Sequence, residues 1–220
     1  MSYGQVNADV IGTSVAGSNL GAGNASTMKN RIINGAMILN QRGSGTLTLS
    51  GANQFALDRF IASCDTAATV TVQQSSTAPT GFVNSYLTTV TTGASPSASD
   101  DNRIMQRIEG YNVSDLNFGT ANAKTVTLSF WVYSSLTGTF GGSFRNGAAN
   151  RSYPYTYTVS SANTWTQISI TIAGDTSGTW LTTNGIGLQI SFDLGSGSSL
   201  KGTVCRVYPY INSIIYIGIR

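Results

Sequence analysis

The chain has 220 residues, a net charge of +3, and charged side chains at only 10% of its positions. This length is sufficient for one sizeable domain with a hydrophobic core and an appendage. Nucleic-acid-binding surfaces need several basic side chains along one face, and here the basic residues are scattered, with Arg103 and Arg107 a close pair that has Glu109 beside it. No stretch has the apolar length of a membrane span. We therefore expect neither nucleic acid nor a membrane as a partner.

The composition also bears on where the protein is found. The first residues, MSYGQVNADVIG, have neither the basic start nor the apolar run of a secretory signal. Serine, threonine, asparagine and glycine occupy positions that charged residues usually take, which suits proteins outside cells or within large assemblies. Such a composition without an export signal fits release by lysis, as for a virus particle assembled in the host cytoplasm.

Residues 1–29 differ from the rest of the chain. They are rich in small residues, and their apolar residues are too sparse for one face of a helix or a strand. Such a segment is either disordered or an extended arm that orders against a partner. The apolar residues exceed what a plain linker requires, which favours a docking arm. The residues expected to dock are Val6, Val10, Ile11, Val15 and Leu20.

From residue 30 onward, strand-like segments follow one another with turn residues between them. The predicted strands are 36–41, 46–50, 54–63, 68–76, 82–91, 103–111, 125–135, 138–146, 152–160, 164–174 and 186–195. Residues 113–118 form one helical turn, with Ser114 as its candidate cap. Because no crossover helices separate the strands, the pattern predicts an all-β fold. We expect an antiparallel β-sandwich (jelly roll) over residues 30–220, preceded by the extended N-terminal arm.

The segment 125–135 (TVTLSFWVYSS) shows the alternation most clearly. Successive side chains of a strand point to opposite faces. One face carries only aliphatic and phenyl side chains and is predicted to lie in the core: Val126, Leu128, Phe130 and Val132. The other carries Trp131 and Tyr133. Fully exposed tryptophan is rare, so we expect Trp131 in the interior or in an interface, and Trp165 in the core.

The sequence argues against an enzyme. It has no histidine, one glutamate and eight aspartates. The absence of histidine removes Ser-His triads and histidine-ligated zinc. Asp58 is expected to pair with the adjacent Arg59, and Glu109 with a nearby arginine. No convincing carboxylate pair remains for glycoside hydrolysis.

No metal and no cofactor are expected either. Residues 95–102 (SPSASDDN) offer carboxylate and amide oxygens to calcium, but they lack the fixed ligand steps of a calcium loop, so a solvated turn is the preferred interpretation. Cys64 and Cys205 are far apart, and their spacing does not specify a disulfide. We expect two unpaired, small hydrophobic residues.

Several long motifs resemble bacteriophage tail-fibre-like proteins. They are MKNRIINGAMILNQRG (28–43), FALDRF (55–60), VQQSSTAPTGFVNS (72–85), the segment 106–146, the segment 150–180 and NGIGLQISFDLGSGSS (184–199). The N-terminal segment is similar to the start of such phage and cyanophage proteins. The resemblance, which covers residues 1 to about 199, implies a jelly roll like those of carbohydrate-binding modules, borne on a virion and usually trimeric.

The segment 200–220 departs from that pattern. Its residues 214–219 (IIYIGI) alternate, are free of proline and would aggregate if left exposed. We expect a strand there that pairs with a sheet edge of its own or of a neighbouring subunit, with Pro209 beginning the turn that leads into it.

Two functions remain open. Sugar-binding modules stack flat aromatic rings on sugars, and Tyr153, Tyr155 and Trp180, near turns, are the candidate ligand-binding residues. We expect a tail fibre that displays its jelly roll for recognition of host-surface glycans, docked by residues 1–29 to other virion proteins and assembled as a homotrimer. The alternative is a purely structural adaptor or decoration protein that binds only other virion proteins.

Overall fold

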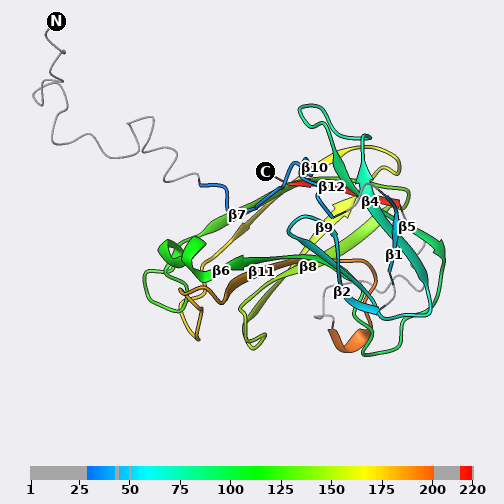
Figure 1. Ribbon diagram of the computed structural model, residues 1–220. Helices are drawn as coiled ribbons and strands as arrows, with labels where there is room; N and C mark the ends of the chain where they lie inside the picture. Colours follow the sequence, from blue (N-terminus) through cyan, green and yellow to red (C-terminus); the bar gives the residue numbers. More distant parts are fainter. Residues whose placement is uncertain (1–28, 43–44, 50, 201–213, 220) are drawn as a thin grey trace, which may run out of the picture. The chain divides into compact units, whose positions relative to one another are not determined.

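The computed structural model describes residues 29–42, 45–49, 51–200 and 214–219, with Ala52 and residues 214–219 described by their backbone alone (Figure 1). The chain divides into two units, Met1–Arg31 and Ile32–Arg220. Residues 1–28, which include all five predicted docking residues, lie outside the described residues, so the docking arm stays a prediction. All of the described strands belong to the second unit.

These strands form two six-stranded sheets in which every pair is antiparallel. Sheet A has the order β1 (Leu47–Thr48), β4 (Thr69–Ser75), β5 (Ser85–Thr92), β12 (Ile214–Ile219), β7 (Val126–Ser134), β10 (Thr166–Ile172). Sheet B has the order β2 (Gly51–Leu57), β3 (Phe60–Cys64), β6 (Arg103–Glu109), β11 (Ile186–Asp193), β8 (Gly138–Arg145), β9 (Ser152–Val159). This is the all-β jelly-roll sandwich that the sequence predicted.

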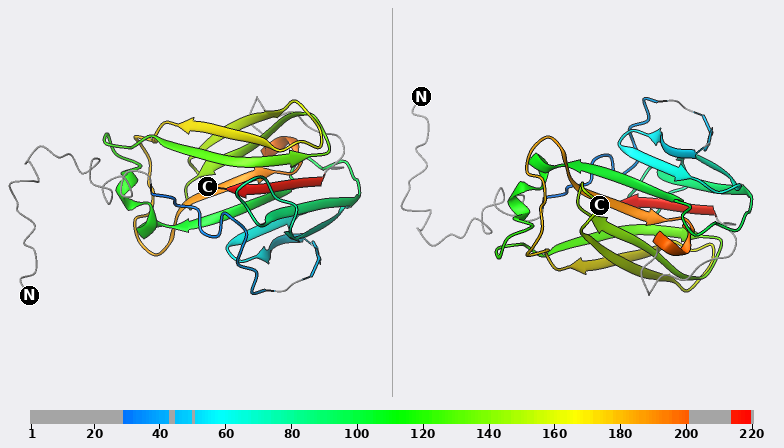
Figure 2. Two further views of the ribbon diagram at one scale, coloured as in Figure 1. Left: turned by 90° about the horizontal axis from the view of Figure 1, so that it is seen from above. Right: turned by 90° about the horizontal axis from the view of Figure 1, so that it is seen from below.

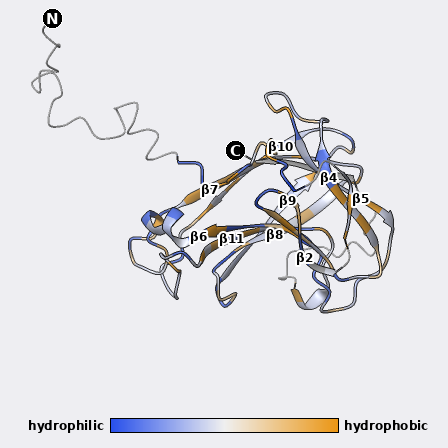
Figure 3. Ribbon diagram, viewed as in Figure 1, coloured by the Kyte–Doolittle hydropathy of each residue, from blue (hydrophilic) through white to orange (hydrophobic). Residues whose placement is uncertain are grey.

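The core lies between the two sheets. Leu128, Phe130 and Val132 of β7 are no more than 3% exposed, as the alternation predicted. Phe130 packs edge-on against Phe192 of β11 and Tyr157 of β9, with ring centroids 5.1 and 5.0 Å apart. Burying a side chain of this size contributes about 1.5–3 kcal/mol. Figure 3 shows the hydrophobic positions recurring along the strands of both sheets.

Three local predictions are wrong. Residues 36–41 form a loop rather than a strand, because the Asn34 side chain closes it by accepting from the Leu39 N–H at 2.9 Å and donating to the Leu39 carbonyl at 2.8 Å. The predicted strand 54–63 is a hairpin, with Arg59 at φ 75° in the turn between β2 and β3. Ser114 does not cap its helical turn, since Val113 is the N-cap residue.

The short helical turns of the described residues lie in loops. They are η3 (Gly110–Asn112), η4 (Ser114–Leu116) and η5 (Ser198–Leu200). No helix in the part of the chain that the structure describes is long and apolar enough to cross a membrane.

Residues 214–219 form a strand, as predicted, but at an unexpected place. β12 is hydrogen-bonded to β5 on one side and to β7 on the other, so it lies inside sheet A and not at an edge. Figure 2 shows it in red between these two strands. The segment that leads into β12, including Pro209, lies outside the described residues.

Candidate functional site

The outer face of sheet B carries polar and charged side chains where three strands meet. Because side chains alternate, Ile104, Ile190 and Phe144 face the core, and their chain neighbours on β6, β11 and β8 face outward. The register sets the outward residues in three rows. Arg107, Gln189 and Arg145 form the first; Met105, Ser191 and Ser143 form the second; Arg103 and Asp193 form the third.

An open pocket of about 410 Å³ lies over this face. The strands β6, β8, β9 and β11, the turn 146–151 and the loops 95–102 and 194–200 contribute its walls, which include Ser143, Arg145, Ser191 and Asp193. Pro154 and Leu200 are the larger apolar side chains of the lining, and no aromatic ring lines it among the described residues. The pocket therefore offers hydrogen bonds rather than ring stacking.

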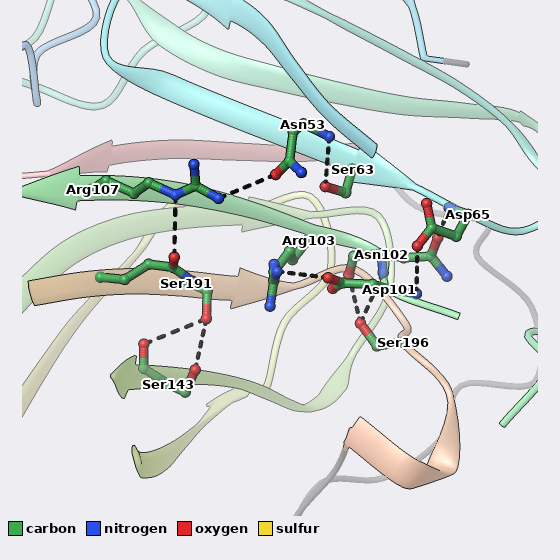
Figure 4. Close-up of polar contacts among 11 residues, drawn as sticks. Asn53, Ser63, Asp65, Asp101, Asn102, Arg103, Arg107, Ser143, Ser191 and Ser196 are labelled. Atoms are coloured by element: carbon green, nitrogen blue, oxygen red, sulfur yellow. Dashed lines mark hydrogen bonds and ion pairs between the residues drawn. The ribbon is translucent and has the colours of Figure 1, made fainter. Parts of the chain in front are cut away.

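Hydrogen bonds fix the walls of the pocket (Figure 4). The hydroxyl oxygens of Ser143 and Ser191 are 2.7 Å apart. Ser196 Oγ accepts from the Asn102 backbone N–H at 3.0 Å and donates to the Asn102 carbonyl at 2.9 Å. Asn102 is 1% exposed, and its Oδ1 accepts from the Asp65 N–H at 2.9 Å. A ligand would thus meet side chains that are already positioned.

The two carboxylates of the pocket already have partners. Asp101 lies 2.6 Å from Arg103 Nη2. Burial raises the pKa of Asp101, and the charges of Asp65 and Asp193 act in the same direction, while Arg103 opposes them. Asp193 Oδ1 accepts from the backbone N–H groups of Gly195 at 3.1 Å and Ser196 at 2.7 Å.

Three buried donor nitrogens on β6, β8 and β11, in contrast, have no acceptor among the described residues. They are Nε of Arg103, Nε of Arg145 and Nε2 of Gln189. A buried donor left without a partner costs about 1–3 kcal/mol. Burial lowers the pKa of the Arg145 guanidinium, and the like charges of Arg103 and Arg107 lower it further. The outer face of sheet B therefore has a surplus of donors beside Arg145.

The structure buries one of the three residues predicted to form an aromatic ligand shelf. Tyr155 is 4% exposed and lies in the core, where its hydroxyl donates to the Ser191 carbonyl at 2.8 Å, so its ring cannot present a face to a ligand. Tyr153 is 44% exposed. Trp180 is half-buried, packs edge-on against Phe118 at 5.0 Å and donates from Nε1 to Asp175 at 3.1 Å. Ligand binding by Tyr153 and Trp180 stays a prediction.

The aromatic residues of β7 lie on the outer face of sheet A. Trp131 and Tyr133 are half-buried, so Trp131 is not in the interior, and its place in an interface stays a prediction. Trp165, predicted in the core, is also half-buried and packs against Tyr133 with ring centroids 5.5 Å apart. The predicted core position of Trp165 is wrong, because it precedes the edge strand β10 on the side that faces away from sheet B.

The remaining charged residues are mostly structural. Glu109 accepts from Arg59 Nη2 at 2.8 and 2.9 Å, which confirms its predicted pairing. The predicted pair of Asp58 with Arg59 is wrong, since Arg59 pairs with Glu109 and Asp58 lies 3.8 Å from Arg42.

Two further sequence predictions concern the loop 95–102, as a candidate calcium site, and the two cysteines. In the loop 95–102, Asp100 accepts from the Ser97 N–H at 2.8 Å, so its carboxylate closes the turn. The described residues contain no group of three or more acidic, cysteine or histidine side chains arranged to hold a metal ion. Cys64 is a buried free thiol, and Cys205 lies outside the described residues.

The fold and the pocket thus define a jelly-roll sandwich with a polar pocket on the outer face of one sheet. No protein-family model matches the chain, and no curated protein matches its sequence. Among solved structures, it is similar to the enzymatically active domain of tailspike protein 4 of bacteriophage CBA120, with 14% identity and a TM-score of 0.42; the match covers 87% of this chain and 21% of the tailspike chain.

Two further similarities are to sugar-binding proteins. A putative sugar-binding protein from Bacteroides thetaiotaomicron is 11% identical, with a TM-score of 0.49 and coverage of 86% of this chain and 97% of the other. A family 11 carbohydrate-binding module from Clostridium thermocellum, solved with a β-1,3-1,4-mixed-linked tetrasaccharide, is 12% identical, with a TM-score of 0.43 and coverage of 80% and 95%. Similarities of this size do not extend beyond the general fold.

Proposed function

We propose that the chain is a phage tail-fibre component whose sandwich recognises a glycan of the host surface at the pocket on sheet B. The observation that carries this proposal is the polar pocket of about 410 Å³ with hydrogen-bonded walls. Hydroxyl, amide and guanidinium groups held in place are what the many hydroxyl groups of a sugar require for recognition. The protein binds the glycan without cleaving it, because the chain has no histidine and the two carboxylates of the pocket are already engaged.

The sequence resemblance supports the virion part of the proposal. The segments 106–146 and 150–180 resemble phage tail-fibre-like proteins over long, specific motifs. We place the protein in the virion, with residues 1–29 docking it to other virion proteins and three copies forming a homotrimer. Deletion of residues 1–29 is expected to leave the sandwich folded and to abolish incorporation into particles. Incorporation of the truncated chain would contradict the docking role.

The glycan part is tested by blocking the pocket. Ser152 is exposed and lines the pocket from β9. Ser152→Trp fills the pocket with an indole ring and is expected to lower binding to an array of bacterial surface polysaccharides by at least about tenfold. Thr158→Trp is the matched control, because Thr158 is exposed on the same face of β9, about 20 Å along the strand. Equal binding by both variants, or no binding by the wild type, would refute glycan recognition at this pocket.

A structural adaptor is the second candidate. Two consecutive exposed apolar side chains favour it: Ile38 is 61% exposed and Leu39 is 51% exposed, and contiguous apolar surface is typical of contacts with other proteins. If the protein is an adaptor, neither the wild type nor Ser152→Trp binds polysaccharide, and Ser152→Trp impairs particle assembly. A density map of the intact particle separates the two functions, since a receptor-binding pocket faces outward and an adaptor pocket is covered by protein.

A further inference from the structure

One row of side chains on the outer face of sheet B consists of hydrogen-bond donors. The register sets Gln189 of β11 opposite Arg107 of β6 on one side and opposite Arg145 of β8 on the other. The carboxylate of the same strand, Asp193, is four residues away, which corresponds to about 13 Å along β11. Among the described residues on these three strands, this row therefore contains two arginines and an amide but no carboxylate.

The Gln189 amide has a fixed orientation. Its Oε1 accepts from Arg107 Nε at 3.3 Å. Because Arg107 Nε–H can only donate, the amide oxygen has to face Arg107, and the amide nitrogen faces the opposite way, where the register places Arg145. Gln189 is 4% exposed, and neither its Nε2 nor Nε of Arg145 has an acceptor in the described part of the chain. Two adjacent buried donors thus lack an acceptor.

The charge of Arg145 is not balanced within the described residues. No carboxylate there lies within 4 Å of Arg145, and the carboxylate whose charge acts on it, Asp101, is bound to Arg103. The like charges of Arg103 and Arg107 act on the Arg145 guanidinium as well. Arg145 also lines the pocket, and the register places Gln189 directly beside it on β11.

We propose that Gln189 and Arg145 bind the oxyanion of an acidic sugar residue, a carboxylate or a sulfate ester, while Arg107 holds the Gln189 amide oxygen, so that the recognised glycan is an anionic polysaccharide. This inference rests on the proposed glycan-binding function. An oxyanion accepts several charge-assisted hydrogen bonds at once and so satisfies donors that have no acceptor of their own. A neutral sugar brings hydroxyl groups that donate as well as accept, and a row of donors does not favour it.

The inference is tested by titrating isotope-labelled protein with glucuronate, galactose sulfate, glucose and galactose while the arginine Nε–H and glutamine amide signals are followed by NMR. We expect one or both acids to shift the signals of Arg145 Nε and the Gln189 amide, with glucuronate and galactose sulfate distinguishing a carboxylate from a sulfate site. The neutral sugars should leave these signals in place. Arg145→Gln should weaken binding of the acid by about tenfold or more. Lys124→Gln, which removes one positive charge at an exposed position, should not.

Two outcomes would overturn the inference in different ways. If glucose or galactose shifts the same signals as strongly as the acids do, the pocket binds glycans without selecting an anion, and the proposed function remains. If neither acid shifts them, the anion site is refuted whatever the polysaccharide array shows.

A second variant needs no sugar. Gln189→Glu places a carboxylate between Arg107 and Arg145, where it supplies the missing acceptor from within the protein. We expect it to raise Tm and to abolish the response to glucuronate. Gln167→Glu, an identical change at an exposed position on β10, should leave both unchanged. A fall in Tm for Gln189→Glu, as for an unpaired buried carboxylate, would overturn the inference.

Discussion

At the scale of single residues, two buried tyrosines differ in whether their hydroxyls are hydrogen-bonded. Tyr155 donates to the Ser191 carbonyl at 2.8 Å. Tyr86 is 0% exposed, and its hydroxyl has no partner in the described part of the chain. Burial without a partner raises the pKa of the Tyr86 phenol. The two positions form a natural pair for measuring what an unpaired hydroxyl costs.

We predict that removing the two hydroxyls has opposite effects on the free energy of unfolding. Tyr86→Phe should leave stability unchanged or raise it by about 1 kcal/mol, because a buried polar group without a partner is replaced by hydrogen. Tyr155→Phe should lower stability by about 1 kcal/mol, because it removes a bond and leaves a buried carbonyl with one partner fewer. Urea denaturation measures both. A loss for Tyr86→Phe equal to that for Tyr155→Phe would show that the Tyr86 hydroxyl has a partner.

Asp175 joins two loops and gives stability a dependence on acid pH. It accepts from Arg151 Nε at 2.7 Å and Nη2 at 2.6 Å, and from Trp180 Nε1 at 3.1 Å. The hydrogen bond from Arg151 is the main cause that holds the pKa of Asp175 well below its usual range. A lowered folded pKa stabilises the protein above the unfolded value, and this contribution is lost as the pH falls toward the folded pKa.

We therefore predict that Asp175→Asn lowers Tm at neutral pH and removes part of the fall in Tm between about pH 4 and pH 2. Thermal melting of the wild type and the variant across this range measures the effect. Parallel curves for the two proteins would show that the pair with Arg151 contributes nothing.

At the scale of elements, the strands could be predicted from sequence more reliably than the site could. Period-two alternation placed β7 and β9 within two residues of their ends, because alternation reflects one buried face. It also showed that Tyr153 and Tyr155 share a face. Alternation does not tell how far along a strand the opposite sheet extends. The extent of the opposite sheet is what buries Tyr155 and leaves Tyr153 exposed.

The pocket was not predictable, because its residues meet through long-range register. Arg107, Arg145 and Gln189 are separated by about forty residues at each step, and only the pairing of β6, β11 and β8 sets them in one row. In sequence they are ordinary polar positions of three strands. The one available signal was that each of the three follows or precedes a core residue in its strand, namely Ile108, Phe144 and Ile190. Alternation then places the three polar side chains on the outer face.

The central position of β12 gives a prediction about hydrogen exchange. Ile215, Tyr216 and Ile217 are paired with both β5 and β7. Inside a sheet, each backbone N–H donates to one neighbour or the other, whereas an edge strand leaves alternate N–H groups unpaired. We expect consecutive amides of residues 215–217 to be protected as strongly as those of residues 128–132. Protection at alternate residues would place β12 at an edge, and rapid exchange throughout would refute the strand.

At the scale of the whole molecule, the sheet edges are unequally protected against pairing with another chain. Pro154 interrupts the edge strand β9, and β1 has only two residues. Near β2, the Arg42 guanidinium covers the Phe55 ring at 4.5 Å. The fourth edge, β10, has seven residues with no proline and no charged side chain, and no described strand is hydrogen-bonded to its outer edge. Long uncharged edges of this kind invite pairing with another copy.

We predict that the chain forms a homotrimer in solution and that β10 takes part in the contact between copies. Light scattering at micromolar concentration should give three times the chain mass of 23.0 kDa, about 69 kDa. Ser169→Lys adds a charge at an exposed position in the middle of β10 and should shift the population toward monomer, because a charged edge resists pairing. Thr158→Lys on β9, the edge that Pro154 already interrupts, should leave the trimer intact. A wild-type mass of 23.0 kDa would refute the trimer, and equal masses for the two lysine variants would exclude β10 from the contact.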